Sequence, residues 1–499
     1  MERRLQFVVF LSGAVLMSLE LLGSRVLAPS FGSSIFVWGS LITVFLTALA
    51  LGYGLGGRLA DRHPSPSAIS MILSAAAVLI LPAVQWAHPL LQALLRTGLG
   101  ARWSALTASM ILFLPPSLAM GMVSPFAVRL GVRQLATVGA VAGGYSALST
   151  AGSILGTLLT AFLLIPAFSV PALLLLLAGT LAFCGLLMVR DLRSVSAAGT
   201  ATLTCALSAF FQASPQDLGE EKTLLVRDSA YHHIVVTEMD RVRHMRFDNL
   251  RQGAIFLDDP SRPVHAYAEG LSLAWALRPA IRRVCQVGLG TGAVPRMMVR
   301  LLPDVFVDSV EIDPVVRDIA KQYFLYEESD RVRTIVEDGR VFLARRGDPY
   351  DLIVLDAYNG TGVPFHLMTR EFFQLVRGRL VPEGVFAANF VGGVMGRDAR
   401  LFWASYQTIR HQFGQVYLLS PELAAGSKSF QGNLILLATV SADPVAPEDF
   451  RRRAAELGAR WRLRSLRRWG DSVLHNPSPP PGLPELTDAH APVETLQGF

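Results

Sequence analysis

Six long apolar runs in the first 215 residues constrain this chain more than any other feature of its sequence. A helix needs about twenty apolar residues to cross a bilayer. Runs of that length cover residues 6–28, 35–57, 68–88, 104–126, 138–165 and 169–189. Although a basic start followed by an apolar run can mark a signal peptide, Glu20 and Arg25 interrupt the first run and no clean cleavage site follows. The pattern predicts an α-helical transmembrane bundle over residues 1–215, embedded in a lipid bilayer.

Charge is divided unevenly between this part and the remainder. Residues 1–215 hold 11 Lys and Arg against 4 Asp and Glu, whereas the rest of the chain holds 34 against 35. The arginines of the first part occupy short loops, with four pairs at alternate ends of the spans: Arg3 and Arg4, Arg58 and Arg62, Arg129 and Arg133, Arg190 and Arg193. The opposite ends hold only Arg96 and Arg102. The positive-inside rule then predicts a cytoplasmic N-terminus. No nucleic-acid partner is expected, because the positive charge is not on a soluble face.

Residues 194–211 form a shorter stretch rich in Ala, Ser, Thr and Gly. It fits a seventh span, an interfacial helix or a half-helix, and the sequence leaves these alternatives open. A full crossing would place the residues that follow outside the cell, where nucleotide-type substrates are scarce. We give the supply of such substrates more weight than the hydropathy of residues 194–211. We therefore expect a multi-pass protein of the cell (inner) membrane with a cytoplasmic catalytic domain.

Several residues within the spans have alternative interpretations. Small side chains recur at Gly139, Gly143, Gly144, Ser146, Gly152 and Gly156, which favours close helix packing. Ionisable groups at membrane depth are costly. Arg25 near a span end fits snorkelling to the surface, whereas Glu20 fits a functional or a structural role. The three cysteines, Cys184, Cys205 and Cys285, lie in apolar segments and suggest no disulfide or metal framework.

From residue 276 onward, apolar strands alternate with helical patterns. Val284–Val287 runs into Gly288, Gly290 and Gly292, a helix follows to Leu302, and a second strand at Val305–Val310 ends in Glu311 and Asp313. This order opens a doubly wound sheet. We therefore predict a C-terminal α/β Rossmann-like domain at 276–440, of the S-adenosylmethionine methyltransferase type. A small β-rich subdomain is expected at 216–275, and a basic helix, a Pro-rich linker and a tail at 441–499.

Carboxylates follow three predicted strands in this domain. Glu311 ends the second strand, Asp338 follows Val332–Val336, and Asp356 follows Leu352–Leu355. Any one of them could cap a helix or lie in a solvated loop. Because the carboxyl ends of parallel strands meet at one edge, where ligands bind, the three together predict a nucleotide site. We expect Glu311 to accept hydrogen bonds from a ribose, Asp338 to lie near an adenine, and Asp356 to face the reacting centre.

Motifs distributed over residues 223–440 resemble the spermidine synthase family of polyamine aminopropyltransferases. They are Ala230-Tyr231-His232, Phe247 to Gln252, Tyr267-Ala268-Glu269, Val310 to Asp313, Glu337-Asp338-Gly339, Leu355-Asp356, Thr369 to Phe373 and Pro382-Glu383-Gly384. The first two spans, through Glu20-Leu21 and Phe31 to Gly39, and the segment Leu486 to Glu494 resemble the membrane-fused branch of that family.

The resemblance implies an enzyme that transfers an aminopropyl group from decarboxylated S-adenosylmethionine to an amine such as putrescine and releases methylthioadenosine. It implies that Asp356 is the general base, and that no tightly bound cofactor or metal is needed. The donor would be bound by Gly288, Gly290, Thr291, Gly292, Glu311, Asp313, Asp338, Gly339 and Gln252. The amine would be bound by Tyr231, His232, Tyr267, Glu269, Tyr358 and Asn359.

Four positions depart from the family pattern, and all concern the amine groups. Thr291 and Asn359 stand where the family has aspartates, His232 replaces a glutamine, and residues 424–431 replace a Tyr-Pro-Ser-Gly stretch. A dication requires compensating carboxylates. Substitutes could come from Asp258, Asp259 or Glu269, or from Asp488 and Glu494 if the tail folds over the site.

Two other functions therefore remain open beside aminopropyl transfer to a small-molecule amine. The enzyme could use S-adenosylmethionine itself, for methyl transfer or internal cleavage, because Thr291 no longer selects the decarboxylated donor by charge. Alternatively, the bundle could transport or sense a polyamine or another small cation under control of the nucleotide domain. The sequence leaves a homodimer open.

Overall fold

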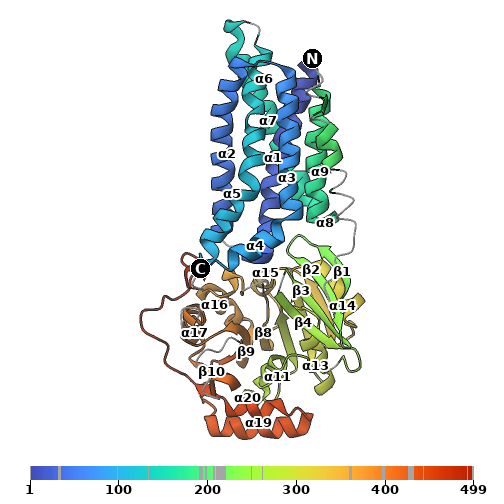
Figure 1. Cartoon of the computed structure of the whole chain (residues 1–499). Coiled ribbons are helices and arrows are strands. Elements are labelled where there is room, and N and C mark those ends of the chain that lie inside the picture. The colour runs from blue at the N-terminus through green and yellow to red at the C-terminus, as the bar shows by residue number, and fades with distance from the viewer. Residues whose placement is uncertain are drawn as a thin grey trace. The chain divides into compact units, whose positions relative to one another are not determined.

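A computed structural model describes residues 2–31, 35–97, 99–132, 134–189, 195–196, 199–205, 208, 221–248, 250–260, 262–358, 362–395, 399–424, 432–441, 443–491 and 493–496. The chain forms two compact units. One comprises Met1–Asp217 with Arg227–His233, and the other comprises Leu218–Val226 with Ile234–Phe499. The first is helical and the second is built around two sheets (Figure 1).

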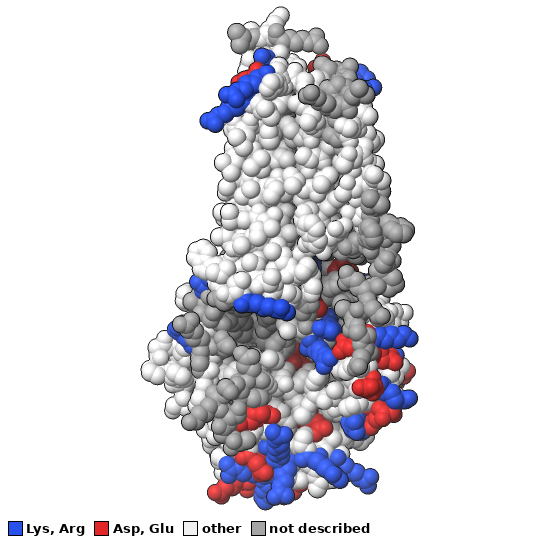
Figure 2. Space-filling model, in the orientation of Figure 1, with Lys and Arg blue, Asp and Glu red and all other residues white. Residues whose placement is uncertain are grey.

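The helical unit consists of long helices joined by short turns. They are α1 (Glu2–Phe31), α2 (Ile35–Arg62), α3 (Pro66–Gln85), α4 (Ala87–Leu95), α5 (Gly100–Gly121), α6 (Val123–Gly131), α7 (Val138–Leu159), α8 (Ile165–Ala167) and α9 (Val170–Leu187). A π-helical turn at Thr160–Leu164 continues α7. Six stretches of the described helices are long and apolar enough to cross a membrane, and they coincide with the six apolar runs of the sequence. Figure 2 shows a broad band of this unit without charged side chains.

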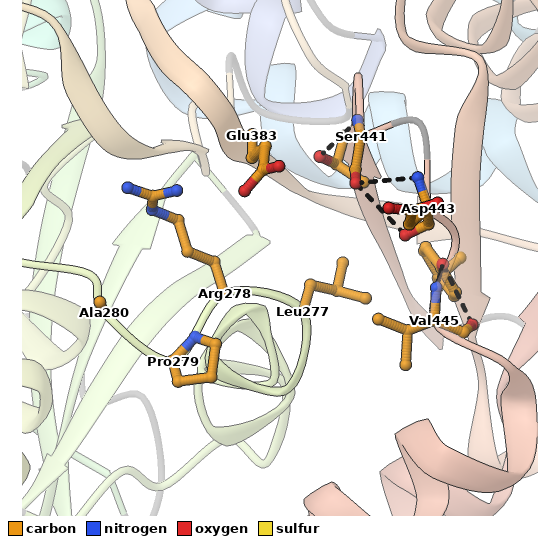
Figure 3. Close-up of a pocket in the computed structure, with 10 residues that line it drawn as sticks. Leu277, Arg278, Pro279, Ala280, Glu383, Ser441, Asp443 and Val445 are labelled. Atoms are coloured by element: carbon orange, nitrogen blue, oxygen red, sulfur yellow. Dashed lines mark hydrogen bonds between the residues drawn. The ribbon is translucent and has the colours of Figure 1, made fainter.

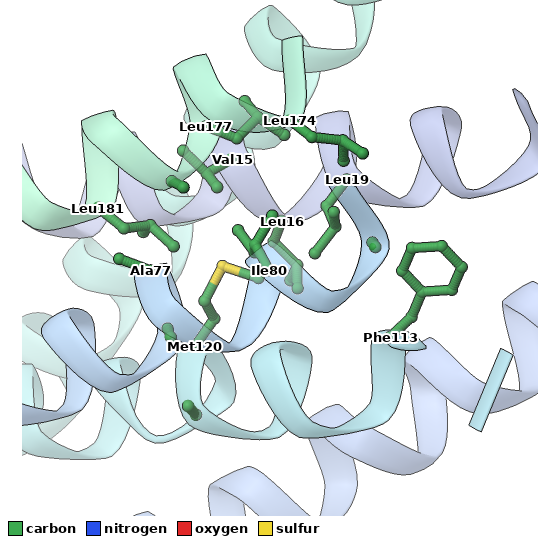
Figure 4. Packing of buried hydrophobic residues seen from close by; sticks show 14 of the residues in the cluster. Val15, Leu16, Leu19, Ala77, Ile80, Phe113, Met120, Leu174, Leu177 and Leu181 are labelled. Carbon is green, nitrogen blue, oxygen red and sulfur yellow. The ribbon is translucent and has the colours of Figure 1, made fainter. Parts of the chain in front are cut away.

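The bundle core includes apolar side chains from α1, α2, α3, α5, α6 and α9. Leu19, Ile80, Phe113 and Leu181 are buried there (Figure 4). Between α1 and α7 the backbones nearly touch, since a Cβ added at Gly152 would lie 1.9 Å from the Phe10 carbonyl oxygen. Only glycine permits that approach. The predicted close packing thus holds at Gly152 and Gly156, but a Cβ at Gly139, Gly143 or Gly144 would meet no heavy atom within 4 Å.

The loop at residues 227–233 packs against the helices and belongs to the helical unit. Arg25 Nη2 of α1 donates to the Ala230 carbonyl oxygen at 2.5 Å. At the start of α9, the Val170 N–H donates to Asp228 Oδ2 at 3.3 Å. Arg25 therefore binds a protein carbonyl as well as lying near the end of a span.

A four-stranded sheet begins the second unit. Its strands are β1 (Lys222–Asp228), β2 (His233–Met239), β3 (Val242–Phe247) and β4 (Leu250–Phe256), paired in sequence order. Strand β3 is antiparallel to both β2 and β4. The second sheet has eight strands: β5 (Arg283–Val287), β6 (Phe306–Glu311), β7 (Val332–Val336), β8 (Tyr350–Leu355), β9 (Leu380–Gly392), β10 (Gln415–Leu419), β11 (Gly432–Thr439) and β12 (Leu474–His475).

The strand order of this sheet is β12-β10-β11-β9-β8-β5-β6-β7. Strands β7, β6, β5, β8 and β9 are parallel, whereas β11 and β10 are antiparallel to their neighbours. The chain progresses outward from β5 to β7 and then returns to β8 on the other side of β5. Ligands of doubly wound sheets bind beside such a switch point, at the carboxyl ends of the strands. The predicted α/β Rossmann-like fold is confirmed by this topology.

Helices cover the large sheet. They are α11 (Tyr267–Leu271), α12 (Ala274–Leu277), α13 (Ala293–Leu301), α14 (Pro314–Tyr323), α15 (Gly339–Ala344), α16 (Arg370–Gly378), α17 (Ala399–Phe413), α18 (Pro421–Ala424), α19 (Pro447–Trp461), α20 (Ser465–Asp471) and α21 (Val493–Leu496). The basic helix predicted within 441–499 is divided into α19 and α20, because Arg462 adopts φ +58° and ends α19.

Candidate functional site

Asp356 lies directly after β8, beside the switch point, and its two carboxylate oxygens have different donors. Asn389 Nδ2, on the neighbouring strand β9, donates to Oδ1 at 2.9 Å. The Tyr267 hydroxyl, at the start of α11, donates to Oδ2 at 3.1 Å. The carboxylate is thus held at the sheet edge by one donor on each oxygen.

Burial raises the pKa of Asp356, and the hydrogen bonds from Asn389 and Tyr267 lower it in part. The side chain nevertheless stays partly exposed. The pKa of Tyr267 is raised well above its usual value by burial and by the Asp356 charge, so its hydroxyl stays protonated and acts as a donor. The Asp356 carboxylate can therefore accept a proton. It is partly exposed, and its orientation is fixed by Tyr267 and Asn389.

The glycine turn after β5 brings the backbone close to this carboxylate. Gly288 has φ +95°, and a Cβ there would lie 2.2 Å from the Asp356 carbonyl oxygen. Gly292, at φ +71°, precedes α13, and a Cβ there would lie 2.4 Å from the Tyr326 ring. Gly290 also has positive φ but faces open space within 4 Å. The first and third glycines are required by packing, and the middle one leaves room for a ligand.

Glu311 ends β6 and holds this turn in place. Its Oε2 accepts the Leu289 N–H at 3.0 Å, and its Oε1 accepts the Asp313 N–H at 3.0 Å. Burial raises the pKa of Glu311, whereas these amides lower it. Asp313 caps α14 by accepting the Val315 N–H at 2.9 Å. Each carboxylate oxygen has a second lone pair, so Glu311 can still accept hydrogen bonds from a ligand.

Asp338 is the N-cap of α15. Its Oδ1 accepts the N–H groups of Arg340 and Val341 at 2.9 and 3.0 Å. Its Oδ2 lies 3.1 Å from His366 Nε2. Gly339 follows in close contact with the sheet, since a Cβ there would lie 2.3 Å from Val287 Cγ1. Helix capping, an alternative that the sequence left open, is one role of this aspartate, and Oδ2 faces away from the helix amides.

The other predicted donor-site residues lie on or beside β4. Thr291 is buried, and a Cβ at Gly253 would lie 2.8 Å from its Cγ2. Gln252, next to Gly253 on β4, is half-buried. The threonine that replaces the family aspartate therefore fills space under β4 and adds no charge.

Two predicted amine-site residues are occupied by protein partners. The Tyr358 hydroxyl donates to the Asn389 carbonyl oxygen at 2.8 Å and accepts the Val391 N–H at 2.8 Å, so it is anchored on β9. Ser465 of α20 donates to the Glu269 carboxylate. Asp258, suggested as a substitute acid, is exposed and accepts the Asp259 N–H at 3.1 Å.

Tyr231 and His232 lie in the loop of the helical unit. Tyr231 is 45% exposed, whereas His232 is buried. Burial, with the nearby Arg25 charge, lowers the pKa of His232 to about 4. His232 is therefore neutral near pH 7. Asn359 and most of 424–431 lie outside the described residues, as do 194, 197–198, 206–207 and 209–211.

Asp488, suggested as a substitute acid in the tail, already has protein partners. Its carboxylate accepts two hydrogen bonds from Arg340, at 2.7 and 2.5 Å, and one from Thr369 at 2.7 Å. These donors lower the pKa of Asp488 to about 2. The carboxylate already compensates an arginine, so it is not available for a substrate cation. The side chain of Glu494 is outside the described part.

Sequence reasoning missed Asn389, which contacts the carboxylate directly. It is only 3% exposed and interrupts an apolar run, Val385 to Val391, in a central strand. A buried polar residue in such a run needs a partner, and that signal could have identified it. Asn433 of β11 extends the network, because its Nδ2 donates to Asn389 Oδ1 at 2.9 Å.

A cavity of about 280 Å³ lies at the other end of the sheet, lined by Leu277, Arg278, Pro279, Ala280, Glu383, Tyr417, Thr439, Ser441, Asp443 and Val445 (Figure 3). Glu383 lies at the start of β9, whereas Asp356 follows the end of the parallel strand β8. This cavity is therefore separate from the carboxylate edge.

Comparison with known proteins agrees with the motifs at that edge. A model of the spermine/spermidine synthase domain matches residues 265–419. The polyamine aminopropyltransferase of Vibrio vulnificus is 34% identical over 212 residues, which cover 41% of this chain and 69% of that enzyme. The chain belongs to the polyamine aminopropyltransferase family. It is thus related to enzymes, and the predicted enzyme class is confirmed at this level.

Other relatives of this aminopropyltransferase-family chain include a methyltransferase. The N-terminal histidine N-methyltransferase of Emericella nidulans is 34% identical over 192 residues, which cover 36% of this chain and 32% of that protein. Among solved structures, a probable spermidine synthase from Corynebacterium glutamicum is 20% identical, with a TM-score of 0.40, and covers 48% of this chain and 88% of its own.

Proposed function

We propose that the chain transfers an aminopropyl group from decarboxylated S-adenosylmethionine to an amine. The neutral amine attacks the propyl carbon next to the sulfonium sulfur. A carbon–nitrogen bond forms as the carbon–sulfur bond breaks, and the sulfur leaves as the thioether of methylthioadenosine. Asp356 takes the proton that the new ammonium loses, because an amine must present a lone pair to attack.

The position of Asp356 is the observation that carries this proposal. A partly exposed carboxylate with a raised pKa, held by Tyr267 and Asn389 beside the glycine turn, suits a base next to a bound nucleoside. Glu311 and Asp338 would meet the ribose and the adenine from the neighbouring strand ends. Gly290 leaves space for the ligand at the turn.

S-adenosylmethionine itself is the second candidate donor, with methyl transfer as the reaction. Thr291 favours it, because this buried neutral side chain stands where the family has an acid for the donor's aminopropyl nitrogen. The methyltransferase relative supports the same alternative. The acceptor class stays an amine in both cases.

Product analysis separates these reactions. Purified full-length protein would be incubated with each donor, with and without putrescine, and the products identified by mass spectrometry. We expect methylthioadenosine and an aminopropylated amine, and no turnover by Asp356→Asn. S-adenosylhomocysteine would indicate methyl transfer, and methylthioadenosine without an altered amine would indicate internal cleavage. Full turnover by Asp356→Asn would overturn the assigned base, and no product from either donor would favour a transporter or sensor.

We further propose that the helical unit is embedded in the cell membrane. Its uncharged surface band and its six long apolar helices support this placement. Arginines at the beginning of α1 and the ends of α2 and α6 mark one end of the bundle, where Arg129 pairs with Asp61 at 3.5 Å. We call this the arginine-rich end, and the positive-inside rule places it in the cytoplasm.

Contacts within the helical unit favour opposite membrane faces for the arginine-rich end and the loop 227–233. Helix α7 is parallel to α1, because Gly152 meets Phe10 and Gly156 meets Ala14. The end of α1 and the start of α9 are therefore at the same end of the bundle. Arg25 and Val170 bind the loop there.

The chain must also return along the bundle after α9. Helix α9 ends at Leu187, at the arginine-rich end, whereas Ser208 accepts a hydrogen bond from Gln85, at the far end of α3. Twenty positions separate Leu187 from Ser208 in the sequence, and a helix of that length would rise roughly 30 Å, the thickness of a bilayer core. We therefore propose a seventh crossing between Leu187 and Ser208, which, with the arginine-rich end inside, would put the loop 227–233 on the non-cytoplasmic face. The cytoplasmic placement expected from substrate chemistry would require the bundle to insert the other way round.

Cysteine accessibility tests this placement. In a variant whose three cysteines are replaced, single cysteines would be introduced at His63 and at Asp348, both exposed positions. We expect a membrane-impermeant maleimide to label position 348 in cells with a permeable outer membrane, and position 63 only after lysis. The reverse pattern would restore the cytoplasmic placement. Labelling of both positions from one face would overturn the seventh crossing.

A further inference from the structure

Asn433 lies behind the residue that holds the base. It begins the described part of β11 with Gly432 and pairs in register with Val391 of β9. Asn389 is two residues before Val391, so the two asparagines are diagonal neighbours on one face of the sheet. Their side chains meet, and Asn433 Nδ2 donates to Asn389 Oδ1 at 2.9 Å.

The direction of this hydrogen bond follows from the chemistry of Asp356. An ionised carboxylate only accepts hydrogen bonds. The Asn389 amide must therefore present its nitrogen to Asp356, which turns its oxygen toward Asn433. Asn433 in turn must present nitrogen. A donor at position 433 thus opposes rotation of the Asn389 amide, because rotation would place an oxygen against a carboxylate.

The rest of Asn389 is fixed independently. The Tyr358 hydroxyl donates to its carbonyl oxygen at 2.8 Å and accepts the Val391 N–H two residues later. The backbone is thereby anchored, and amide rotation about the side chain is the freedom that remains. The hydrogen bond from Asn433 restricts this rotation of the Asn389 amide.

We propose that Asn433 is a positioning residue for the base. By fixing the orientation of the Asn389 amide, it keeps a donor on Asp356 Oδ1, which orients the carboxylate toward the substrate and favours its ionised form. Asn433 of β11 thus orients Asn389 of β9, and Asn389 orients Asp356 directly after β8. This assignment rests on the proposed role of Asp356 as base.

Substitutions at position 433 separate orientation from packing. In Asn433→Asp the new side chain can only accept, so the Asn389 amide is expected to rotate toward it and present oxygen to Asp356. As the pH falls, kcat/KM should then decline earlier than in the wild type. We expect the midpoint of this acid limb to lie about one pH unit higher. Asn433→Leu, which adds no charge, should raise the limb less, and Asn433→Gln, which keeps the donor, should restore it. Thr439→Val, at the far end of the same strand, is the matched control for stability.

A second measurement needs no turnover. Carbodiimide labels protonated carboxyl groups, and peptide mass spectrometry would follow the labelling of Asp356 against pH, relative to the exposed Asp348. The midpoint for Asp356 should be higher in Asn433→Asp and Asn433→Leu than in the wild type, Asn433→Gln or Thr439→Val. Equal midpoints in all variants would overturn the proposal for Asn433. Full activity of Asp356→Asn, by contrast, would overturn the proposed function and leave the orientation of this carboxylate as a separate, measurable fact.

Discussion

The Tyr267 hydroxyl donates to Asp356 Oδ2 at 3.1 Å, from a helix that lies 89 positions earlier in the chain. This hydrogen bond lowers the pKa of Asp356 against the effect of burial. We expect Tyr267→Phe to raise the acid limb of the pH profile by about one unit, because the ionised base loses a donor. Initial rates of methylthioadenosine release across pH would measure it. An unchanged limb would show that Tyr267 does not act on the base.

We expect the ionised Asp356 side chain to destabilise the folded protein at neutral pH. Its pKa is raised in the folded state, so the folded protein binds a proton more tightly than the unfolded chain does. The resulting stabilisation is complete below the unfolded value of about pH 4 and is lost as pH rises through the folded pKa. Asp356→Asn should therefore be inactive yet unfold at a higher temperature than wild type near pH 7. Thermal unfolding at several pH values tests this, and a lower melting temperature for the variant at pH 7 would contradict it.

Much of the catalytic half could be predicted because its signals are local. Apolar runs placed β5, β6, β7 and β8 within two residues, and the last three runs led to Glu311, Asp338 and Asp356, the acids that the structure places at the sheet edge. The network behind Asp356 could not be predicted, because the contact between Asn389 and Asn433 depends on the register of β9 with β11. Likewise, the partners of Glu269 and Asp488 come from segments 196 and 148 residues away in sequence.

His232 should make the protein sensitive to mild acid. Its pKa is lowered to about 4 by burial and the Arg25 charge, so the unfolded chain takes up a proton near pH 6.5 while the folded protein does not. Stability should fall by about 1.4 kcal/mol for each pH unit between about 6.5 and 4. His232→Gln, which restores the family residue, should lose this dependence and keep the activity at pH 7. Denaturant titrations at pH 7 and pH 5 would compare the two proteins, and equal losses in both would exclude His232 as the cause.

The tail should act as a structural strap. Leu486, Val493 and Leu496 are buried, and each buried side chain of this kind contributes roughly 2 kcal/mol. Deleting 484–499 should therefore lower the melting temperature by more than about 5 °C. Asp488→Asn should cost about 1 kcal/mol or less, because its ion pair with Arg340 is partly exposed. That contribution is present above about pH 4 and is lost as pH falls toward 2.

An amine-binding role of Asp488 makes a different prediction for the same variant. If the carboxylate compensated a substrate cation, Asp488→Asn would raise the KM for the amine without a matching effect on stability. We expect the KM to stay unchanged, since Arg340 and Thr369 already occupy the carboxylate. Steady-state kinetics with putrescine, beside thermal unfolding of the same preparation, would distinguish the two roles.

Alanine substitutions at two glycines of the turn should differ sharply, although both residues have positive φ. At Gly288 a methyl group would lie 2.2 Å from the Asp356 carbonyl oxygen, so the backbone that carries the base must shift. At Gly290 a methyl group would meet nothing within 4 Å, and the cost is about 1 kcal/mol of backbone strain. We expect Gly288→Ala to lose stability and kcat together, whereas Gly290→Ala should keep most of its stability and lose donor affinity, because its methyl group enters the space left for the ligand. Calorimetric titration with decarboxylated S-adenosylmethionine beside thermal unfolding measures both effects, and equal behaviour of the two variants would show that the turn does not approach the base as the structure has it.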